Sequence, residues 1–344
     1  MAEFWKEFDA HPIDPIDYAA ERQAAEWAIE AQARVQIEAA GQVIHVPDVA
    51  QLPSGPFHVQ GLEFAPQTAL KPSDLQRIGK LRNLKVLNLR ETSGVDAAPE
   101  SLGQLTTLEY LDFMKSGITN AEMPQLSGMK NLTYLDLTFT VIDNAGMAVV
   151  SQLSNLKYLG LGEARVGDEG LARLKALDQL EWLSLGPSVT DQGLGHLANF
   201  PKLTTVLGLK PHHLTEVGIG HLQLLPNLTA LNVVVATDAD LVRMKPLAHL
   251  TSLTFNLHQF TVSGIEVLGE FPKLADLNLG DHQDFDDSYL IPLAKLSPLR
   301  KLILQDVKVT AAGIAKFREQ RPDVLLNVNG TDYPPIQELN APPK

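Results

Sequence analysis

Four aromatic residues stand at equal spacing in the middle of the chain. Tyr110, Tyr134, Tyr158 and Trp182 follow one another at intervals of 24 residues, and each directly precedes a leucine. Two positions after each of them the chain carries Asp112, Asp136, Gly160 and Ser184. Tyrosine and tryptophan provide large contact areas at a low cost in conformational entropy. The spacing therefore indicates an aromatic row beside small and acidic residues, where glycine would let a ligand approach closely.

The two aspartates of this row admit three interpretations. On adjacent strands their carboxylates would lie about 5 Å apart, which suits general acid–base catalysis or the binding of a cation. The third interpretation is a polar row of the repeat, because asparagine fills the same position elsewhere, at Asn88, Asn232, Asn256, Asn278 and Asn327. We favour the polar row and predict no catalytic residue.

Other clusters of metal-ligating residue types are weaker candidates. The segment 281–287 contains four aspartates but lacks the order of a calcium loop. His196 and His221 share one position of the repeat, which explains them better than zinc ligation. The sequence contains no glycine-rich phosphate loop and no nucleophile elbow. We therefore predict no metal, no cofactor and no enzymatic activity.

An internal repeat determines the elements that carry these residues. Apolar-x-apolar pairs recur at intervals of 22 to 25 residues through most of the chain. Their first members are Leu62, Leu87, Leu111, Leu135, Leu159, Leu183, Leu207, Leu231, Phe255, Leu277, Leu302 and Leu326. Such a period is typical of a solenoid in which each unit contributes one strand. The residues before, between and after each pair then face one side of the sheet.

The second half of each unit begins a helix. In Val189-Thr190-Asp191-Gln192-Gly193-Leu194, and in four similar segments, a threonine or aspartate precedes an apolar i, i+3 pair. Threonine and aspartate oxygens accept hydrogen bonds from the free N–H groups of a first helical turn, and Thr119 with Glu122 matches a capping box. Each unit is therefore predicted to be strand, turn, short helix and turn.

These patterns together resemble a leucine-rich repeat protein. The series L-x-x-L-x-L followed by V/I-T-D-x-G-L-x-x-L is similar to the ribonuclease-inhibitor-like and GALA-type bacterial subclass, common in planctomycete-like proteomes, over residues 57–330. The usual asparagine three residues after the second leucine is replaced, for example by Thr92, Ser116 and Thr140. The resemblance implies an α/β fold, a curved leucine-rich repeat solenoid with about twelve parallel strands on the concave side and short helices on the convex side.

The ends of the chain differ from the repeats. Residues 1–50 carry ten acidic and three basic side chains, and the first leucine is Leu52. We expect residues 1–56 to form an acidic cap, with a helix capped by Asp14 and starting at Pro15, and a hairpin around residues 39–42. An independent recognition module is the alternative. Residues 57–330 form the array of 24-residue units, and residues 331–344 are expected to be a flexible proline-rich tail.

Composition excludes several classes of function. The 344 residues include no cysteine, which excludes disulfides, thiolate metal sites and cysteine nucleophiles. With 28 basic and 41 acidic residues the net charge is −13, which argues against nucleic acid and anionic membranes as partners. No apolar run approaches the length of a membrane span, and the acidic start does not match a secretory signal. We therefore expect a cytoplasmic protein without membrane insertion.

The architecture favours binding over catalysis. We predict a non-enzymatic scaffold that binds a protein or peptide through its concave face. The predicted ligand-binding residues are Tyr110, Asp112, Tyr134, Asp136, Tyr158, Gly160, Trp182 and Ser184. A carbohydrate-binding protein that uses the aromatic row is the first alternative, and an architectural or assembly protein is the second. The rings could also serve the sheet alone by stacking across strands.

Overall fold

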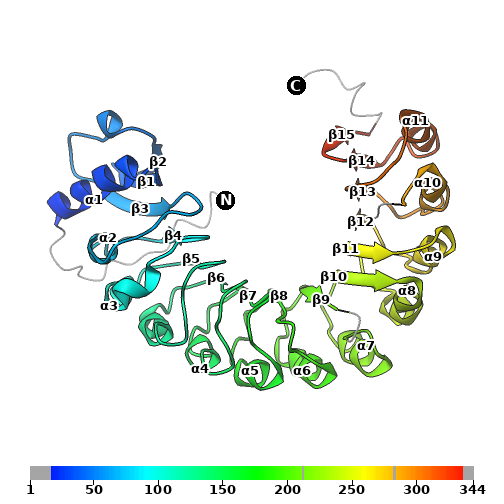
Figure 1. The fold of residues 1–344 in the computed structure, drawn as a ribbon, viewed down its shortest axis with the longest axis horizontal. Coiled ribbons are helices and arrows are strands. Elements are labelled where there is room, and N and C mark those ends of the chain that lie inside the picture. Colours follow the sequence, from blue (N-terminus) through cyan, green and yellow to red (C-terminus); the bar gives the residue numbers. More distant parts are fainter. Residues whose placement is uncertain (1–16, 211–212, 282–283, 336–344) are drawn as a thin grey trace.

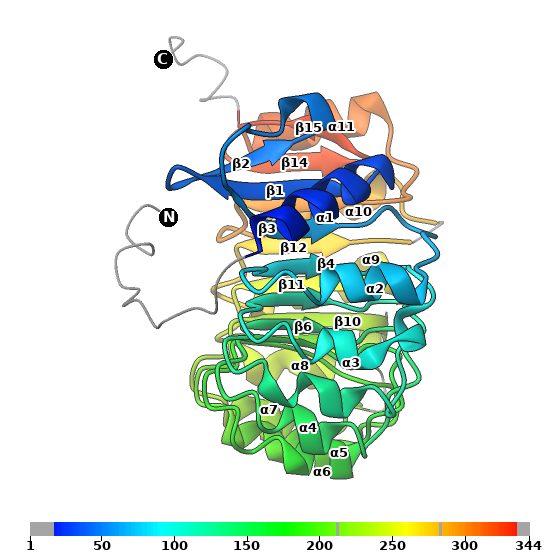
Figure 2. The ribbon, with the colours of Figure 1, turned by 90° about the vertical axis from the view of Figure 1, so that its left-hand side faces the viewer.

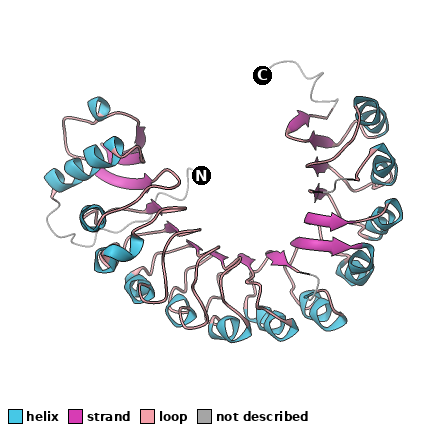
Figure 3. Cartoon of the chain, viewed as in Figure 1, coloured by secondary structure: helices cyan, strands magenta, loops and turns pink. Residues whose placement is uncertain are grey.

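The computed structural model describes residues 17–210, 213–281 and 284–335 of the chain. These residues form an open arc with a sheet along its inner side and helices along its outer side (Figures 1 and 3). The strands run across the arc, roughly perpendicular to its plane (Figure 2). The inner surface of the arc is therefore made by the strands and the turns next to them, and not by the helices.

The described residues contain one sheet of fifteen strands, in the order β15-β14-β13-β12-β11-β10-β9-β8-β7-β6-β5-β4-β3-β1-β2. Its parallel part consists of β3 (His58–Glu63), β4 (Val86–Asn88), β5 (Tyr110–Asp112), β6 (Tyr134–Asp136), β7 (Tyr158–Gly160), β8 (Trp182–Ser184), β9 (Thr205–Leu209), β10 (Ala230–Thr237), β11 (Ser252–Gln259), β12 (Asp276–Leu279), β13 (Lys301–Leu304) and β14 (Leu325–Val328). The antiparallel β1 (Arg34–Ala39), β2 (Gln42–Val46) and β15 (Thr331–Tyr333) extend its two ends. The parallel strands confirm the predicted solenoid.

Short helices connect the strands on the outer side. The α-helices are α1 (Tyr18–Glu30), α2 (Pro72–Ile78), α3 (Pro99–Leu102), α4 (Met147–Val150), α5 (Asp168–Arg173), α6 (Asp191–Gly195), α7 (Glu216–Gln223), α8 (Asp238–Met244), α9 (Val262–Glu266), α10 (Asp287–Ala294) and α11 (Ala311–Gln320). The 3-10 helices are η1 (Val49–Gln51), η2 (Val95–Ala97), η3 (Met123–Gly128), η4 (His196–Asn199), η6 (Lys245–Leu247) and η7 (Val267–Glu270). No helix in the described ranges is long and apolar enough to cross a bilayer.

Strand β9 differs from the register predicted by the repeat. Val206, rather than Leu207, pairs with both Leu183 and Leu231. The reason is a bulge in β9, where Gly208 takes a left-handed φ of 77° and an extra residue enters the strand. Leu207 therefore leaves the core row and is only partly buried.

Strand β11 also differs from the predicted register, but without a bulge. Leu253, rather than Phe255, pairs with Leu231 and Leu277. Phe255 takes the second apolar position of its strand and is completely buried there. The chain offers two consecutive apolar-x-apolar pairs at this point, and the first of them is the one that the fold uses. The other ten parallel strands keep the predicted register.

An apolar core runs between the sheet and the helices along the whole arc. The repeat leucines that point inward, such as Leu84, Leu87 and Leu89, are completely buried. Burying one such side chain contributes roughly 1.5–3 kcal/mol to stability. Because each repeat packs only against its neighbours, the two ends of this core must be closed by other elements.

The N-terminal end of the core is covered by α1 and β1. Ala24, Ala25 and Ala28 of α1 are buried. The buried Glu21 of the same helix accepts a hydrogen bond from the N–H of Val59 in β3 at 2.7 Å. This bond fixes the helix directly to the first parallel strand.

The start of α1 lies further along the chain than the sequence predicts. The helix begins at Tyr18, and the Asp17 carboxylate accepts hydrogen bonds from the next N–H groups as its N-cap. Asp14 and Pro15, the predicted cap and first residue, lie outside the described part of the chain.

The C-terminal end of the sheet extends into the segment predicted to be a flexible tail. Residues 331–333 form β15, which runs antiparallel to β14. The turn between them, Asn329-Gly330, has φ angles of 48° and 83°, as a two-residue hairpin turn requires. The boundary predicted after residue 330 therefore divides a hairpin. The dipeptide Asn329-Gly330 is the sequence signal that could have indicated this hairpin. Residues 336–344 lie outside the described ranges.

A recurring contact joins the start of one helix to the start of the next. The Asp238 carboxylate accepts hydrogen bonds from the N–H and the hydroxyl of Thr261 at 2.9 and 2.6 Å. Thr261 in turn accepts the N–H of Gly264 and so caps α9. A Cβ atom on Gly264 would overlap the Asp238 carboxylate. Similar contacts are Asp168–Thr190–Gly193, Asp191–Thr215–Gly218 and Asp287–Thr310–Gly313.

Gly264→Ala is expected to destabilise the array by about 1–3 kcal/mol, the range for an overpacked site, because its methyl group would displace the Asp238 carboxylate. Gly220→Ala in α7 is the control, since no atom outside its own helical turn lies within 4 Å of the position its Cβ would take. Alanine's better helix propensity should stabilise that variant by up to about 1 kcal/mol. Denaturant unfolding measures both effects, and an unchanged midpoint for Gly264→Ala would contradict the contact.

Candidate binding surface on the concave sheet

The aromatic row lies on the inner face of the sheet. Tyr110, Tyr134, Tyr158 and Trp182 are the first residues of β5, β6, β7 and β8, and each pairs in register with the next. The leucines that follow them are buried in the core. Because side chains alternate along a strand, the aromatic residues and the residues two positions later face the inside of the arc. The structure thus places the eight predicted site residues on four adjacent strands (Figure 1).

The three tyrosines form a stacked ladder. The ring centroids of Tyr110 and Tyr134 are 4.1 Å apart with 13° between the ring planes, and those of Tyr134 and Tyr158 are 4.2 Å apart with 7°. Each ring therefore covers one face of the next ring. Trp182 on the following strand is 46% exposed, whereas the tyrosines are half-buried. The indole thus offers the most exposed ring surface of the row.

The carboxylates of Asp112 and Asp136 are tied to the tyrosine hydroxyls. The hydroxyl-to-carboxylate distances are 3.5 Å for Tyr110–Asp112, 3.5 Å for Tyr134–Asp136 and 3.4 Å for Tyr158–Asp136. The other oxygen of each carboxylate accepts the backbone N–H two residues further on at 2.8 Å. Both aspartates are buried, with 3% and 6% of their surface exposed. The two acids therefore belong to one hydrogen-bonded network beneath the groove.

Burial shifts the protonation of this network. It raises the pKa of Asp112; the Met114 N–H bond opposes the shift and the nearby Asp136 charge adds to it. Burial also raises the pKa of Tyr134 and brings the pKa of Tyr158 to about 12. These hydroxyls therefore remain protonated at neutral pH and act as hydrogen-bond donors.

An amide at position 112 would fit the same contacts. Asn88, in the equivalent position of β4, accepts the N–H of Arg90 at 3.0 Å. Because the pKa of Asp112 is raised in the folded state, folding becomes less favourable as the pH rises through the unfolded and then the folded pKa. Asp112→Asn should therefore raise the unfolding midpoint at about pH 7, and this gain should shrink at about pH 3, where the carboxyl is protonated in both states. An equal gain at both pH values would contradict the burial effect.

The glycines of the row make room for neighbouring side chains. A Cβ atom on Gly160 would overlap the Asp136 carboxylate, and one on Gly162 would lie 2.9 Å from the Ser184 hydroxyl oxygen. The sequence interpretation that these glycines leave space for a ligand is therefore corrected, because side chains of adjacent repeats fill that space. No pattern within a single repeat could have indicated this contact.

A second exposed aromatic residue lies at the end of the same strands. Phe139, in the turn after β6, is 50% exposed and has a φ of 58°. The equivalent positions in neighbouring repeats hold Glu91, Lys115 and Glu163, also at positive φ. The Lys115 ammonium lies 5.7 Å from the Phe139 ring centroid. A bulky residue in this backbone region is strained. Phe139 was not predicted from the sequence, although an aromatic residue where neighbouring repeats carry charged residues was a usable signal.

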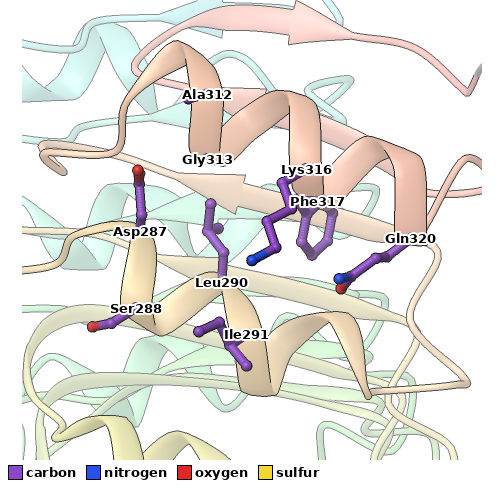
Figure 4. Close-up of a pocket in the computed structure, with 9 residues that line it drawn as sticks. All are labelled: Asp287, Ser288, Leu290, Ile291, Ala312, Gly313, Lys316, Phe317 and Gln320. Carbon is purple, nitrogen blue, oxygen red and sulfur yellow. The ribbon is translucent and has the colours of Figure 1, made fainter.

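Hollows in the described part of the chain lie away from the aromatic row, and one of about 240 Å³ is beside Thr254, Asp276 and Lys301 of β11, β12 and β13. One of about 270 Å³ lies between α10 and α11, where Leu290, Ile291 and Phe317 line its wall (Figure 4). A further hollow, of about 320 Å³, lies at the N-terminal end of the sheet beside Gly61 and Glu63. In the described ranges, no group of three or more His, Asp or Glu side chains is placed to hold a metal ion. The aromatic row therefore remains the strongest candidate site.

The arc of parallel strands, the outer helices and the leucine core define a leucine-rich repeat solenoid. A family model described as "Leucine-rich repeat region" matches residues 57–310, and the chain belongs to this family. The finer subclass suggested by the sequence remains a prediction.

Solved structures with a similar course of the chain include two Listeria monocytogenes proteins. An internalin is 19% identical, with 94% of this chain and 93% of that chain covered and a TM-score of 0.45. An internalin C2 is 20% identical, with 85% and 92% covered and a TM-score of 0.38. A comparison with curated proteins finds no significant match.

Proposed function

We propose that this protein is a non-enzymatic scaffold that binds a protein or peptide segment across strands β5 to β8. The observation that carries the proposal is the half-exposed Trp182 beside the stacked tyrosines on the inner face of the sheet. Leucine-rich repeat arrays present extended concave surfaces for binding. Tryptophan and tyrosine are enriched among the few residues that dominate the energy of such interfaces.

The orientation of the rings favours a protein ligand over a carbohydrate. A sugar ring binds an aromatic side chain by lying on its face, but both faces of Tyr134 are covered by Tyr110 and Tyr158. The tyrosines offer ring edges, which suit the mixed apolar and polar contacts of a polypeptide. Trp182 has the most exposed ring of this row.

The acidic pair supports a ligand that carries hydrogen-bond donors or positive charge. Asn88 and Asn232 occupy the position equivalent to Asp112 on other strands, so the sheet does not require an acid there. Burial makes ionised Asp112 unfavourable for folding. Side chains that lower stability without a structural need are concentrated at functional sites. An arginine or lysine of the ligand would be attracted to this part of the groove.

Phe139 extends the proposed surface toward the C-terminal ends of the strands. It follows β6, and Trp182 begins β8, so two strand spacings of about 10 Å in total separate their repeats. Phe139 also lies five residues beyond Tyr134, the residue of β6 in the aromatic row, which adds up to about 16 Å along the strand direction. An extended peptide therefore needs about six residues to reach from Trp182 to Phe139. Two half-exposed aromatic side chains at this separation can anchor one short segment.

Selection of displayed random peptides on the immobilised full-length chain tests the proposal, with a glycan array probed in parallel. We expect peptides rich in basic and aromatic residues that bind the wild type and lose affinity for Trp182→Ala. Val217→Ala is the matched control, because Val217 is 59% exposed on α7 of the outer side. Peptides that bind both variants equally, or glycans that bind where no peptide does, would contradict the proposal.

A further inference from the structure

The sheet ends at β2 with an unpaired edge. Within the described ranges, β2 has β1 on one side and no strand on the other. The two strands form a hairpin through residues 40–41, whose φ angles are 51° and 77°, and Ala39 pairs with Gln42 next to the turn. From this register, residues 42, 44 and 46 of β2 form the backbone hydrogen bonds to β1. The N–H and C=O groups of Val43 and His45 therefore point away from the sheet.

Strand β2 carries no protective feature within its own length, although Pro47 follows it directly. Its five residues, Gln42 to Val46, include no acid, no lysine or arginine and no proline. Native edges are usually protected by charge, proline, a bulge or a covering element. The strand carries no acidic, lysine or arginine side chain, so the backbone groups of two β2 edges can meet without a carboxylate between them, although residues 1–50 around it hold ten acidic and three basic side chains.

Ile44 indicates that the core continues beyond this edge. It pairs with Ile37, which is completely buried, so Ile44 lies on the core face of the sheet. It is nevertheless 40% exposed, and Val43 on the other face is 50% exposed. A further strand placed beside β2 would both satisfy the free backbone groups and cover Ile44.

The opposite end of the sheet is protected. Strand β15 has three residues, and its Asp332 accepts a hydrogen bond from the Asn327 side chain at 2.6 Å. Pro334 and Pro335 follow directly and have no N–H to donate. A head-to-tail filament that joins β2 to β15 of another copy is therefore disfavoured, whereas two β2 edges are identical and equally open.

We propose that β2 pairs antiparallel with β2 of a second copy of this chain. A pairing centred on Ile44 places the two Ile44 side chains opposite each other and brings Val43 of each copy opposite His45 of the other. The outward N–H and C=O groups of Val43 and His45 then form the backbone hydrogen bonds between the two copies. The contact has a two-fold axis, so it closes at a dimer. It leaves strands β5 to β8 of both arcs free for binding.

Sedimentation velocity of the full-length chain over a concentration series tests this proposal. Ile44→Lys and Ile44→Glu each place like charges directly opposite across the two-fold axis, and each should weaken dimerisation by about tenfold or more. An equimolar mixture of the two variants should restore the dimer, because lysine then faces glutamate. Val217→Lys is the control, a 59% exposed valine on the outer side, and it should leave the dimer intact.

Hydrogen exchange of the wild type provides a second measurement that requires no variant. The amides of Val43 and His45 should exchange more slowly at high than at low protein concentration. A chain that stays monomeric throughout the series, a dimer that survives Ile44→Lys, a charge-swapped mixture that stays monomeric, or exchange at β2 that does not depend on concentration would each overturn the proposal.

Discussion

Ala28→Asp is expected to destabilise the whole array by about 3–5 kcal/mol, the range for an uncompensated buried charge. Ala28 lies in α1 and is completely buried, so a carboxylate at this position would lose its hydration. Leu62 and Phe64, at the start of the first repeat, are buried at the same end of the array. Loss of α1 would expose the first repeat, and the main unfolding transition should move to lower temperature.

Gln23→Asp is the matched control, because Gln23 is exposed on the same helix. A surface substitution of this kind changes stability by about 0.5 kcal/mol or less. Differential scanning calorimetry distinguishes a cap from an independent module at the N-terminus. An independent module would unfold separately in Ala28→Asp and leave the main transition in place, which would contradict its role as a cap.

Replacing two of the three stacked tyrosines should weaken ligand binding strongly. Tyr134→Ala/Tyr158→Ala is expected to cost about 2–4 kcal/mol of binding free energy for a peptide selected on the wild type, or about 30-fold to 1,000-fold in Kd. The two rings stack 4.2 Å apart, so the variant should also unfold at a lower temperature. Titration at a temperature where the variant is fully folded separates the two effects.

Tyr134→Phe/Tyr158→Phe provides the companion measurement. It keeps the stacked rings and removes the hydroxyl bonds to Asp136. Stability should therefore fall less than in the alanine variant, and any remaining loss of affinity reports on the hydroxyls. If the alanine variant loses stability but keeps its affinity per folded molecule, the ladder serves the sheet alone.

The fold was largely predictable from the sequence, because each strand is specified within its own repeat. Alternation around leucines such as Leu87 and Leu111 decides which residues enter the core. The two errors of register have different causes. At β9 the bulge at Gly208 selects Val206, and at β11 Leu253 precedes the predicted Phe255.

The geometry of the candidate site was less predictable than the face of the sheet on which its residues lie. Strand alternation correctly places Tyr134 and Asp136 on the inner face, because that depends on one strand only. The covered ring faces and the burial of Asp136 depend on side-chain contacts between repeats. The same holds for Gly160, because the neighbouring Asp136 carboxylate leaves no room for a Cβ atom there. Phe139 lies in a turn, outside the periodic positions from which the site was derived.

The most direct test of the proposed binding surface is a calorimetric titration of one selected peptide into three proteins: the wild type, Trp182→Ala and Val217→Ala. Trp182 and Val217 are 46% and 59% exposed, so neither truncation leaves a buried cavity. We expect Trp182→Ala to weaken binding by about tenfold or more, as for a hot-spot residue, and Val217→Ala to bind like the wild type. Equal affinity for all three proteins, or a loss confined to Val217→Ala, would contradict binding on the concave face.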